Sequence, residues 1–247
     1  MPAKAHAGCR VAIDTAEAAV LADKIWRNES GRDPDKILWW NQGEDFASLG
    51  IGHFIWYPPG IDGPFQESFP QLLGFLASRG ASMPAWLSED PNPDCPWLTR
   101  EQFLAERNGP KATELRRLLL DSVGLQARFM LARMSMALDA ILAAHPASSA
   151  AVIESRFCTL ASTAAGRYAL VDYVNFKGEG INAEERYAGQ GWGLAQALDG
   201  MRGTFPANVD FAESAARVLQ RRAENAPAER REQRWLPGWL RRVESYR

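Results

Sequence analysis

Residues 24–57, KIWRNESGRDPDKILWWNQGEDFASLGIGHFIWY, hold the most informative pattern of the chain. A helical pattern ends in Glu29-Ser30-Gly31, and a polar loop follows. The chain then becomes extended and glycine-rich in Ser48-Leu49-Gly50-Ile51-Gly52-His53. This order predicts a carboxylate at a helix end that faces an extended segment, which is one way to place a general acid beside a cleft.

The segment before this pattern predicts an amphipathic helix. Asp14-Thr15-Ala16-Glu17 has the form of a capping box. The apolar residues that follow share one face at helical spacing: Ala18, Leu21, Ala22 and Ile25. Glu29 continues that series four residues after Ile25, so its side chain is expected to point toward the core or a cleft.

The rest of the chain predicts an α+β fold that is predominantly α-helical, with one small β-hairpin at residues 46–57. Residues 81–98 are Pro-rich and predicted to be irregular, and 181–190 form a polar loop. Helices are predicted at residues 67–79, 100–107, 110–144 with a break near Gly124, 149–177, 191–201, 208–226 and 235–246. We expect one domain over 1–247, with a catalytic helix and hairpin (10–60), a helical lobe (99–200) and a C-terminal helical extension (208–247).

Composition excludes several classes of protein. The 247 residues are 46% hydrophobic and 23% charged, which predicts a packed core rather than disorder. A net charge of −2 argues against a dedicated nucleic-acid binder. No apolar run is long enough to cross a bilayer. The nine Trp suit either a core or stacking on sugar rings.

The three Cys residues, Cys9, Cys95 and Cys158, show no metal spacing and allow at most one disulfide. Cys158 lies in an apolar run and is interpreted as a buried thiol. We expect neither a metal nor a cofactor. Ala5-His6-Ala7 has the small-x-small form of an export cleavage site, which predicts a periplasmic or secreted protein. An ordinary cytosolic N-terminus is the alternative.

Three segments resemble parts of the lysozyme-like superfamily. Glu29-Ser30, followed by Asp33-Pro34, is similar to the Glu-Ser motif of goose-type lysozymes and soluble lytic transglycosylases. Residues 48–53 resemble the Thr-Ile-Gly-Ile-Gly-His hairpin of phage-type lysozymes. Residues 173–180, YVNFKGEG, loosely resemble the Ala-Tyr-Asn-Ala-Gly-x-Gly motif of lytic transglycosylases. One departure is Gln42, which stands where the phage enzymes carry an Asp.

The resemblance implies a lysozyme-like fold with Glu29 as the general acid, and Ser30 hydrogen-bonded nearby. Such an acid must keep its proton near neutral pH, and an apolar setting and the negative end of a helix would both favour that form. The plainer alternative is a helix-terminal Glu that pairs with Arg27 or Arg32.

Other catalytic assignments remain open. Ser48 matches the hairpin Thr that helps to place the attacking water. Glu44 and Asp45 are candidates for a second carboxylate, and Glu179 is a rival. A separation from Glu29 of roughly 6.5–9.5 Å would predict an inverting hydrolase. Without such a partner, the substrate's own acetamido group or C6 hydroxyl would attack the anomeric carbon.

Substrate-binding residues are expected in the hairpin and in a second polar loop. His53 and Tyr57 would lie in the site beside Glu29. Residues 173–192 would form the far wall of a cleft, because loops of this composition often carry binding residues. The residues proposed there are Tyr173, Asn175, Lys177, Glu179, Tyr187, Gln190 and Trp192.

These observations predict a glycosidase or lytic transglycosylase that cleaves a β-1,4-linked amino-sugar polymer, with peptidoglycan as the expected partner. The protein is expected to act as a monomer. One alternative is a chitosanase- or chitinase-like hydrolase of the same fold. Another is a glycan-binding protein without catalytic activity.

Overall fold

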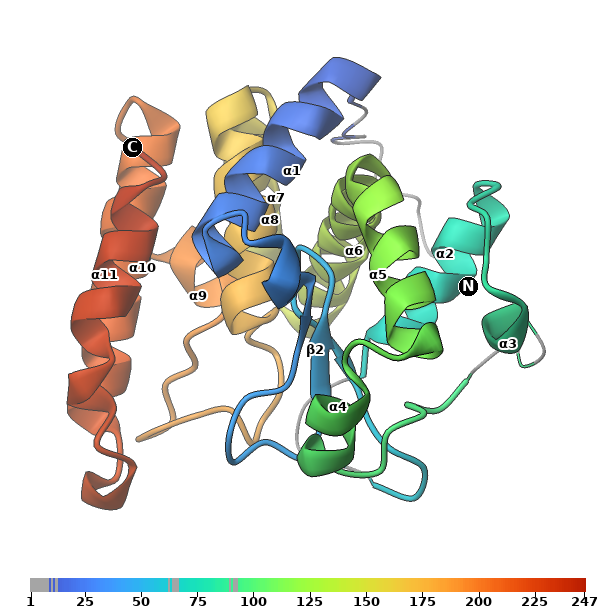
Figure 1. The fold of residues 1–247 in the computed structure, drawn as a ribbon. Coiled ribbons are helices and arrows are strands. Elements are labelled where there is room, and N and C mark those ends of the chain that lie inside the picture. The colour runs from blue at the N-terminus through green and yellow to red at the C-terminus, as the bar shows by residue number, and fades with distance from the viewer. Residues whose placement is uncertain are drawn as a thin grey trace. The chain divides into compact units, whose positions relative to one another are not determined.

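The computed structural model describes residues 9, 11, 13–61, 63, 67–88, 90 and 93–247, apart from the side chain of Ser30. Ala5-His6-Ala7 and the predicted hydrogen bond of the Ser30 side chain therefore lie outside the described part. The chain forms two compact units (Figure 1). Asp14–Met130 make the first unit. Leu131–Arg247, with the described residues before Asp14, make the second. The expectation of a single domain over 1–247 stays a prediction.

The first unit combines a small sheet with helices. It contains α1 (Thr15–Ser30), the 3₁₀ turn η1 (Pro34–Ile37), β1 (Leu38–Trp39), β2 (Ala47–Leu49), β3 (Phe54–Trp56), α2 (Phe69–Ser78), α3 (Ala85–Ser88), α4 (Arg100–Glu106), α5 (Pro110–Asp121) and the first part of α6 (Val123–Ala144). The sheet is antiparallel in the order β1-β2-β3, with Leu38 opposite Leu49 and Ser48 opposite Ile55. The predicted hairpin is therefore present, and β1 adds a strand to it.

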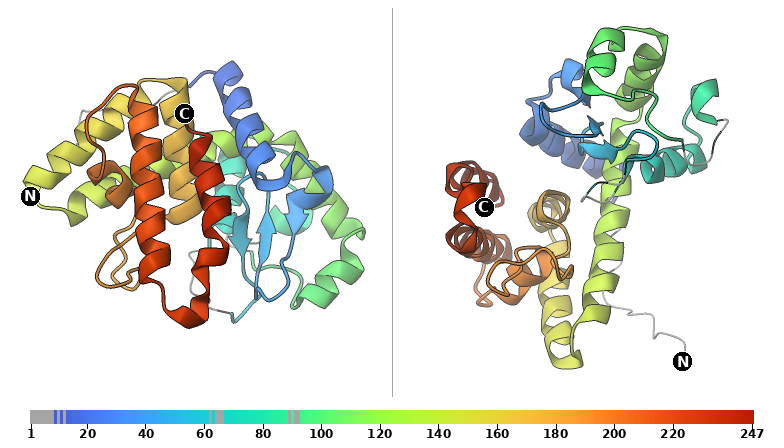
Figure 2. Two further views of the ribbon diagram at one scale, coloured as in Figure 1. Left: turned by 90° about the vertical axis from the view of Figure 1, so that its left-hand side faces the viewer. Right: turned by 90° about the horizontal axis from the view of Figure 1, so that it is seen from below.

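The second unit is helical. It contains the rest of α6, then α7 (Ala147–Ala161), α8 (Ala164–Lys177), α9 (Leu194–Asp199), α10 (Ala207–Asn225), η2 (Ala228–Arg230), η3 (Glu232–Arg234) and α11 (Leu236–Glu244). Within this unit α10 runs beside α11 and packs against α8 (Figure 2). The described chain is thus mainly α-helical with one small sheet, which confirms the α+β class.

Local sequence explains α1. The Asp14 carboxylate accepts a hydrogen bond from the Glu17 amide at 2.8 Å, so the predicted N-cap is present. The four apolar residues of the predicted stripe are all buried. Gly31 ends the helix with φ +67°, a left-handed conformation that glycine adopts at little cost.

Of two long predicted helices, one differs from the structure and one has its break where it was predicted. The helix predicted over 149–177 is wrong as a single element, because α7 ends at Ala161 and α8 begins at Ala164. Thr163 caps α8 by accepting a hydrogen bond from the Gly166 amide at 3.0 Å. The break predicted near Gly124 in 110–144 is confirmed and falls at Ser122, where the buried Gln126 side chain donates to the Leu119 carbonyl at 2.6 Å.

The interpretation of Cys158 as a free thiol was wrong. Cys158 of α7 forms a disulfide with Cys9, and their Cα atoms are 5.4 Å apart. This is the single disulfide that three cysteines allow. Cys95 is the buried free cysteine, and burial raises the pKa of its thiol to about 12.

Within the described residues, the helices are too short or too polar to span a membrane.

Candidate active site

The first cluster brings the end of α1 to the β2–β3 turn. The Glu29 side chain is only 11% exposed, and its Oε2 lies 3.3 Å from Nδ1 of His53. The sequence places these residues on different elements, a helix end and a glycine-rich turn. The structure joins them within the first unit.

The arginines that could have competed for Glu29 bind another carboxylate. Arg27, one turn after Asp23 on α1, and Arg32, beyond the end of the helix, both form ion pairs with Asp23. A side-chain hydrogen bond from Arg32 is the main reason that the pKa of Asp23 is lowered. These two guanidinium groups therefore have a partner of their own.

The turn that carries His53 is held in place by hydrogen bonds to η1 and α6. Gly50 has φ +71°, and its amide donates to the Ile37 carbonyl at 2.8 Å. Gln126 of α6 is fully buried and accepts a hydrogen bond from the Ile51 amide at 2.9 Å. A Cβ on Gly50 would overlap the Gln126 Oε1 atom, so glycine is required for this close approach. Sequence reasoning missed Gln126, whose signal was one amide on a helix that is otherwise mostly apolar.

Ser48 lies on the central strand and is only 4% exposed. Its neighbours across the sheet are Trp39 on β1 and Ile55 on β3. Gln42, the departure from the phage pattern, lies in the loop before β2. The role of Ser48 in placing water stays a prediction.

Glu44 and Asp45 lie in the loop between β1 and β2 and border a cavity of about 340 Å³. The rest of the described lining comes from the same loop, from Pro58 and Ile61, and from the start of α4. The loop is braced where Glu44 Oε2 accepts from Asn41 Nδ2 at 2.9 Å. Asp45 is exposed and Glu44 is partly buried. The structure thus groups these two carboxylates with each other, and Glu29 with His53.

Three of the predicted binding aromatics, Tyr57, Tyr173 and Trp192, are core residues, which corrects their assignment to a sugar-stacking surface. Tyr57 is 5% exposed and packs edge-on against Phe46. Tyr173 is fully buried against Phe211, and its hydroxyl donates to the Trp192 carbonyl at 2.9 Å. Tyr173 therefore anchors the 178–193 loop to α8.

The loop residues predicted to bind glycan form a second cluster, in the second unit. Tyr187 and Gln190 pair through their backbones, with Gln190 exposed. Trp192 is 7% exposed and packs on Tyr187 with ring centroids 4.7 Å apart. Asn175 and Glu179 are partly buried at the end of α8 and just after it.

Arg222 of α10 organises this cluster. Its guanidinium lies 4.0 Å from the centre of the Trp192 ring and binds Glu232 through two hydrogen bonds of 2.7 and 2.9 Å. The Tyr187 hydroxyl also donates to Glu232, at 3.0 Å. Burial opposes ionisation of Glu232, but the hydrogen bonds and charge of Arg222 lower its pKa overall.

Lys177 ends α8 beside this network. Its Nζ atom lies 3.9 Å from the ring centre of Phe176 and 3.8 Å from that of Trp239 on α11. Sequence reasoning selected Lys177 but missed Arg222, Glu232 and Trp239, which lie far along the chain in helical segments without a local motif.

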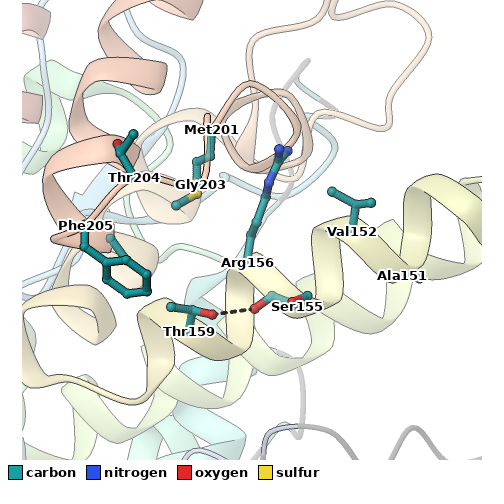
Figure 3. A pocket seen from close by; sticks show the side chains of 10 residues that line it. Ala151, Val152, Ser155, Arg156, Thr159, Met201, Gly203, Thr204 and Phe205 are labelled. Carbon is teal, nitrogen blue, oxygen red and sulfur yellow. Dashed lines mark hydrogen bonds between the residues drawn. The ribbon is translucent and has the colours of Figure 1, made fainter.

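The second unit also holds a cavity of about 460 Å³ between α7 and the 201–207 segment (Figure 3). Its lining contains the exposed Phe205, while the Arg156 guanidinium donates to the carbonyls of Leu198 and Asp199 at the end of α9. The Thr159 hydroxyl donates to the Ser155 carbonyl. The described lining includes no carboxylate or imidazole, so this cavity offers no acid–base pair.

No set of three or more His, Cys, Asp or Glu side chains in the described part of the chain is arranged to hold a metal ion. Comparisons with protein-family models, curated proteins and solved structures returned no match.

Proposed function

We propose that the protein is a glycosidase or lytic transglycosylase of lysozyme type, acting on a β-1,4-linked amino-sugar polymer such as peptidoglycan. The observation that carries this proposal is the sheltered Glu29 carboxyl at the end of α1, 3.3 Å from His53 of the glycine-rich turn. Its shelter from solvent and its place at the end of α1, beside the glycine-rich turn, are the features that support a role as general acid.

In this proposal Glu29 donates its proton to the glycosidic oxygen as positive charge develops on the anomeric carbon. His53 holds Glu29 in place. A neutral His53 that carries its hydrogen on Nδ1 donates to Glu29 Oε2, which leaves the acidic proton on Oε1 for the glycosidic oxygen, and the same Nδ1–H donates to the carboxylate after proton transfer. The pair can therefore support Glu29 before and after the step.

The second half of the reaction has two routes. Glu44 or Asp45 would activate water in an inverting hydrolase. Alternatively, the acetamido group or C6 hydroxyl of the substrate would attack the anomeric carbon, and no second carboxylate is needed. Because Glu44 is the better sheltered of the two acids, it is the residue to test.

Glu29→Gln removes the acidic proton but keeps the size of the side chain. We expect it to lower the cleavage rate of purified peptidoglycan by about 10²- to 10⁴-fold, the usual contribution of a general acid. Glu17→Gln, at the other end of the same helix, is the control and should keep full activity. Equal rates for wild type and Glu29→Gln would refute the assignment.

Glu44→Gln separates the two routes. A loss similar to that of Glu29→Gln would support a two-carboxylate hydrolase, whereas near-normal activity would support attack by the substrate itself. Product analysis gives an independent answer, because an anhydro-muramyl end marks a transglycosylase and a free reducing end marks a hydrolase.

We also propose that the protein works in the periplasm or outside the cell. The Cys9–Cys158 disulfide supports this, because such bonds persist mainly in oxidising compartments. Labelling free thiols in protein taken directly from its source cells would test it, since a fully reduced pair would argue against export.

A further inference from the structure

Three helices of the second unit place cations and aromatic rings together around Lys177. Nζ of Lys177 contacts the faces of Phe176 and Trp239 at 3.9 and 3.8 Å. Arg242 lies over the same Phe176 ring at 4.3 Å, and Arg222 over the same Trp239 ring at 5.0 Å. We call these five residues the Lys177 cluster.

The two arginines of the cluster are neutralised. Arg242 binds Asp172 through two hydrogen bonds of 2.8 and 2.9 Å, and Arg222 binds Glu232 in the same two-pronged manner. Among the described residues, Lys177 forms no ion pair with a carboxylate. Protonated Lys177 therefore adds one positive charge that the cluster does not balance.

Aromatic surface next to Trp239 of the cluster is open to solvent. Trp235 is 43% exposed, and its ring centroid lies 6.3 Å from that of Trp239. Lys177 and Trp239 are themselves partly buried rather than sealed in the core. A cation next to exposed tryptophan is a combination that suits a sugar carrying a carboxylate, because the ring can stack on the pyranose while the ammonium binds the acid.

We propose that the Lys177 cluster and Trp235 form a subsite for the carboxylate of an acidic amino sugar, with Lys177 as the anchoring cation. The subsite deepens the proposed function, since it would recognise the carboxylated units of the same polymer. It does not require that Glu29 be catalytic.

Binding at this subsite should depend on pH. Burial, the largest cause, and the charges of Arg222 and Arg242 together lower the pKa of Lys177 to about 6, and Glu232 opposes them. The charged groups that face Lys177 are thus Arg222 on α10, Glu232 on η3 and Arg242 on α11. A bound carboxylate favours the ammonium form, so binding above pH 6 takes up a proton, and affinity falls as pH rises.

The test compares N-acetylmuramic acid with N-acetylglucosamine, which lacks the lactyl carboxylate. Calorimetry on the full chain at pH 5.5 and pH 7.5 should show the acid binding roughly tenfold or more tightly at the lower pH. The neutral sugar should bind more weakly and without this change. Neither monosaccharide contains a glycosidic linkage that the enzyme could cleave, so the binding measurement is independent of turnover.

Three variants make the test specific. Lys177→Met keeps the stem but should abolish the preference for the acid. Lys177→Arg should keep the preference and lose its pH dependence, because guanidinium stays charged. Lys111→Met is the matched control, since Lys111 lies over the Trp86 ring at 5.3 Å in the first unit, and it should behave as wild type.

Equal affinity of wild type for the two sugars at pH 5.5 would overturn the subsite, as would a preference that survives Lys177→Met. Either result would leave the Glu29 assay untouched. Conversely, full activity of Glu29→Gln on peptidoglycan would end the proposed catalytic function without removing carboxylate binding at Lys177.

Discussion

Gly50 and Gly43 show how one residue can fix the position of a proposed catalytic group. Both have left-handed backbones, with φ of +71° and +84°. A Cβ on Gly50 would collide with Gln126 and approach the Phe54 ring, whereas a Cβ on Gly43 would meet open space. Gly50 is therefore required both by its conformation and by packing, and the turn it makes sets the position of His53 opposite Glu29.

Gly50→Ala is accordingly expected to lower the free energy of unfolding by about 2–5 kcal/mol, from left-handed strain plus overpacking. Gly43→Ala should cost only the strain, about 1–2 kcal/mol. Urea unfolding of the two variants measures the difference. Equal losses would mean that Gln126 does not constrain the turn.

At the scale of elements, a buried carboxylate holds α11 against α8. Asp172 is fully buried and accepts two hydrogen bonds from Arg242, while the Tyr246 hydroxyl donates to it at 2.6 Å. Burial, reinforced by the Asp172 charge, raises the pKa of Tyr246 well above its usual value, so this hydroxyl stays a donor. The last helix is thereby attached through a polar contact that water does not screen.

Asp172→Asn removes the charge but not the shape. We expect it to destabilise the protein by about 3–5 kcal/mol, because it breaks the ion pair that the fully buried Asp172 carboxylate makes with Arg242. Asp23→Asn is the matched control. It breaks the solvent-exposed pairs with Arg27 and Arg32 and should cost less than about 1 kcal/mol. Thermal unfolding near pH 7 compares them, and similar shifts in Tm would contradict the role given to burial.

Sequence predicted those elements whose signals are local. The cap at Asp14, the apolar stripe and Gly31 gave α1 to within a residue, and alternating glycines gave the β2–β3 turn. The break at Ser162-Thr163 was missed because no glycine or proline marks it, although Thr163 has the side chain of an N-cap. The two-residue strand β1 was missed because its pairing with β2 is all that defines it.

The residues of the candidate site were likewise predicted where a local motif marks them and missed where their partners lie far along the chain. Glu29 and His53 were predicted to share a site because the helix end and the glycine-rich turn each carry a local sequence motif. Gln126 lies 75 residues from its partner Ile51, and Arg222 lies 10 residues from Glu232 on another element, so neither pair forms a local motif. Tyr57 and Tyr173 were assigned to binding because composition alone does not separate a stacking ring from a core ring.

At the scale of the whole molecule, the chain leaves and re-enters its second unit. The described residues before Asp14 belong to that unit, the whole first unit follows, and the chain returns at Leu131 within α6. The Cys9–Cys158 disulfide links the two segments of the second unit across a sequence separation of 149 residues. A cross-link over so long a loop removes much conformational freedom from the unfolded chain.

Removing that cross-link should therefore reduce stability by up to about 5 kcal/mol in the chain-entropy description. Cys9→Ser with Cys158→Ser, or reduction of the wild type, should lower the urea midpoint by similar amounts, and reductant should not affect the double variant further. Cys95→Ala is the control, because Cys95 is a buried free thiol, and this variant should keep its sensitivity to reductant. Thiol titration in denaturant should find one reactive group before reduction and three after it, as the pairing and the cysteine count require. Three reactive groups before reduction, or a reductant effect that persists in the double variant, would show that this bond does not stabilise the fold.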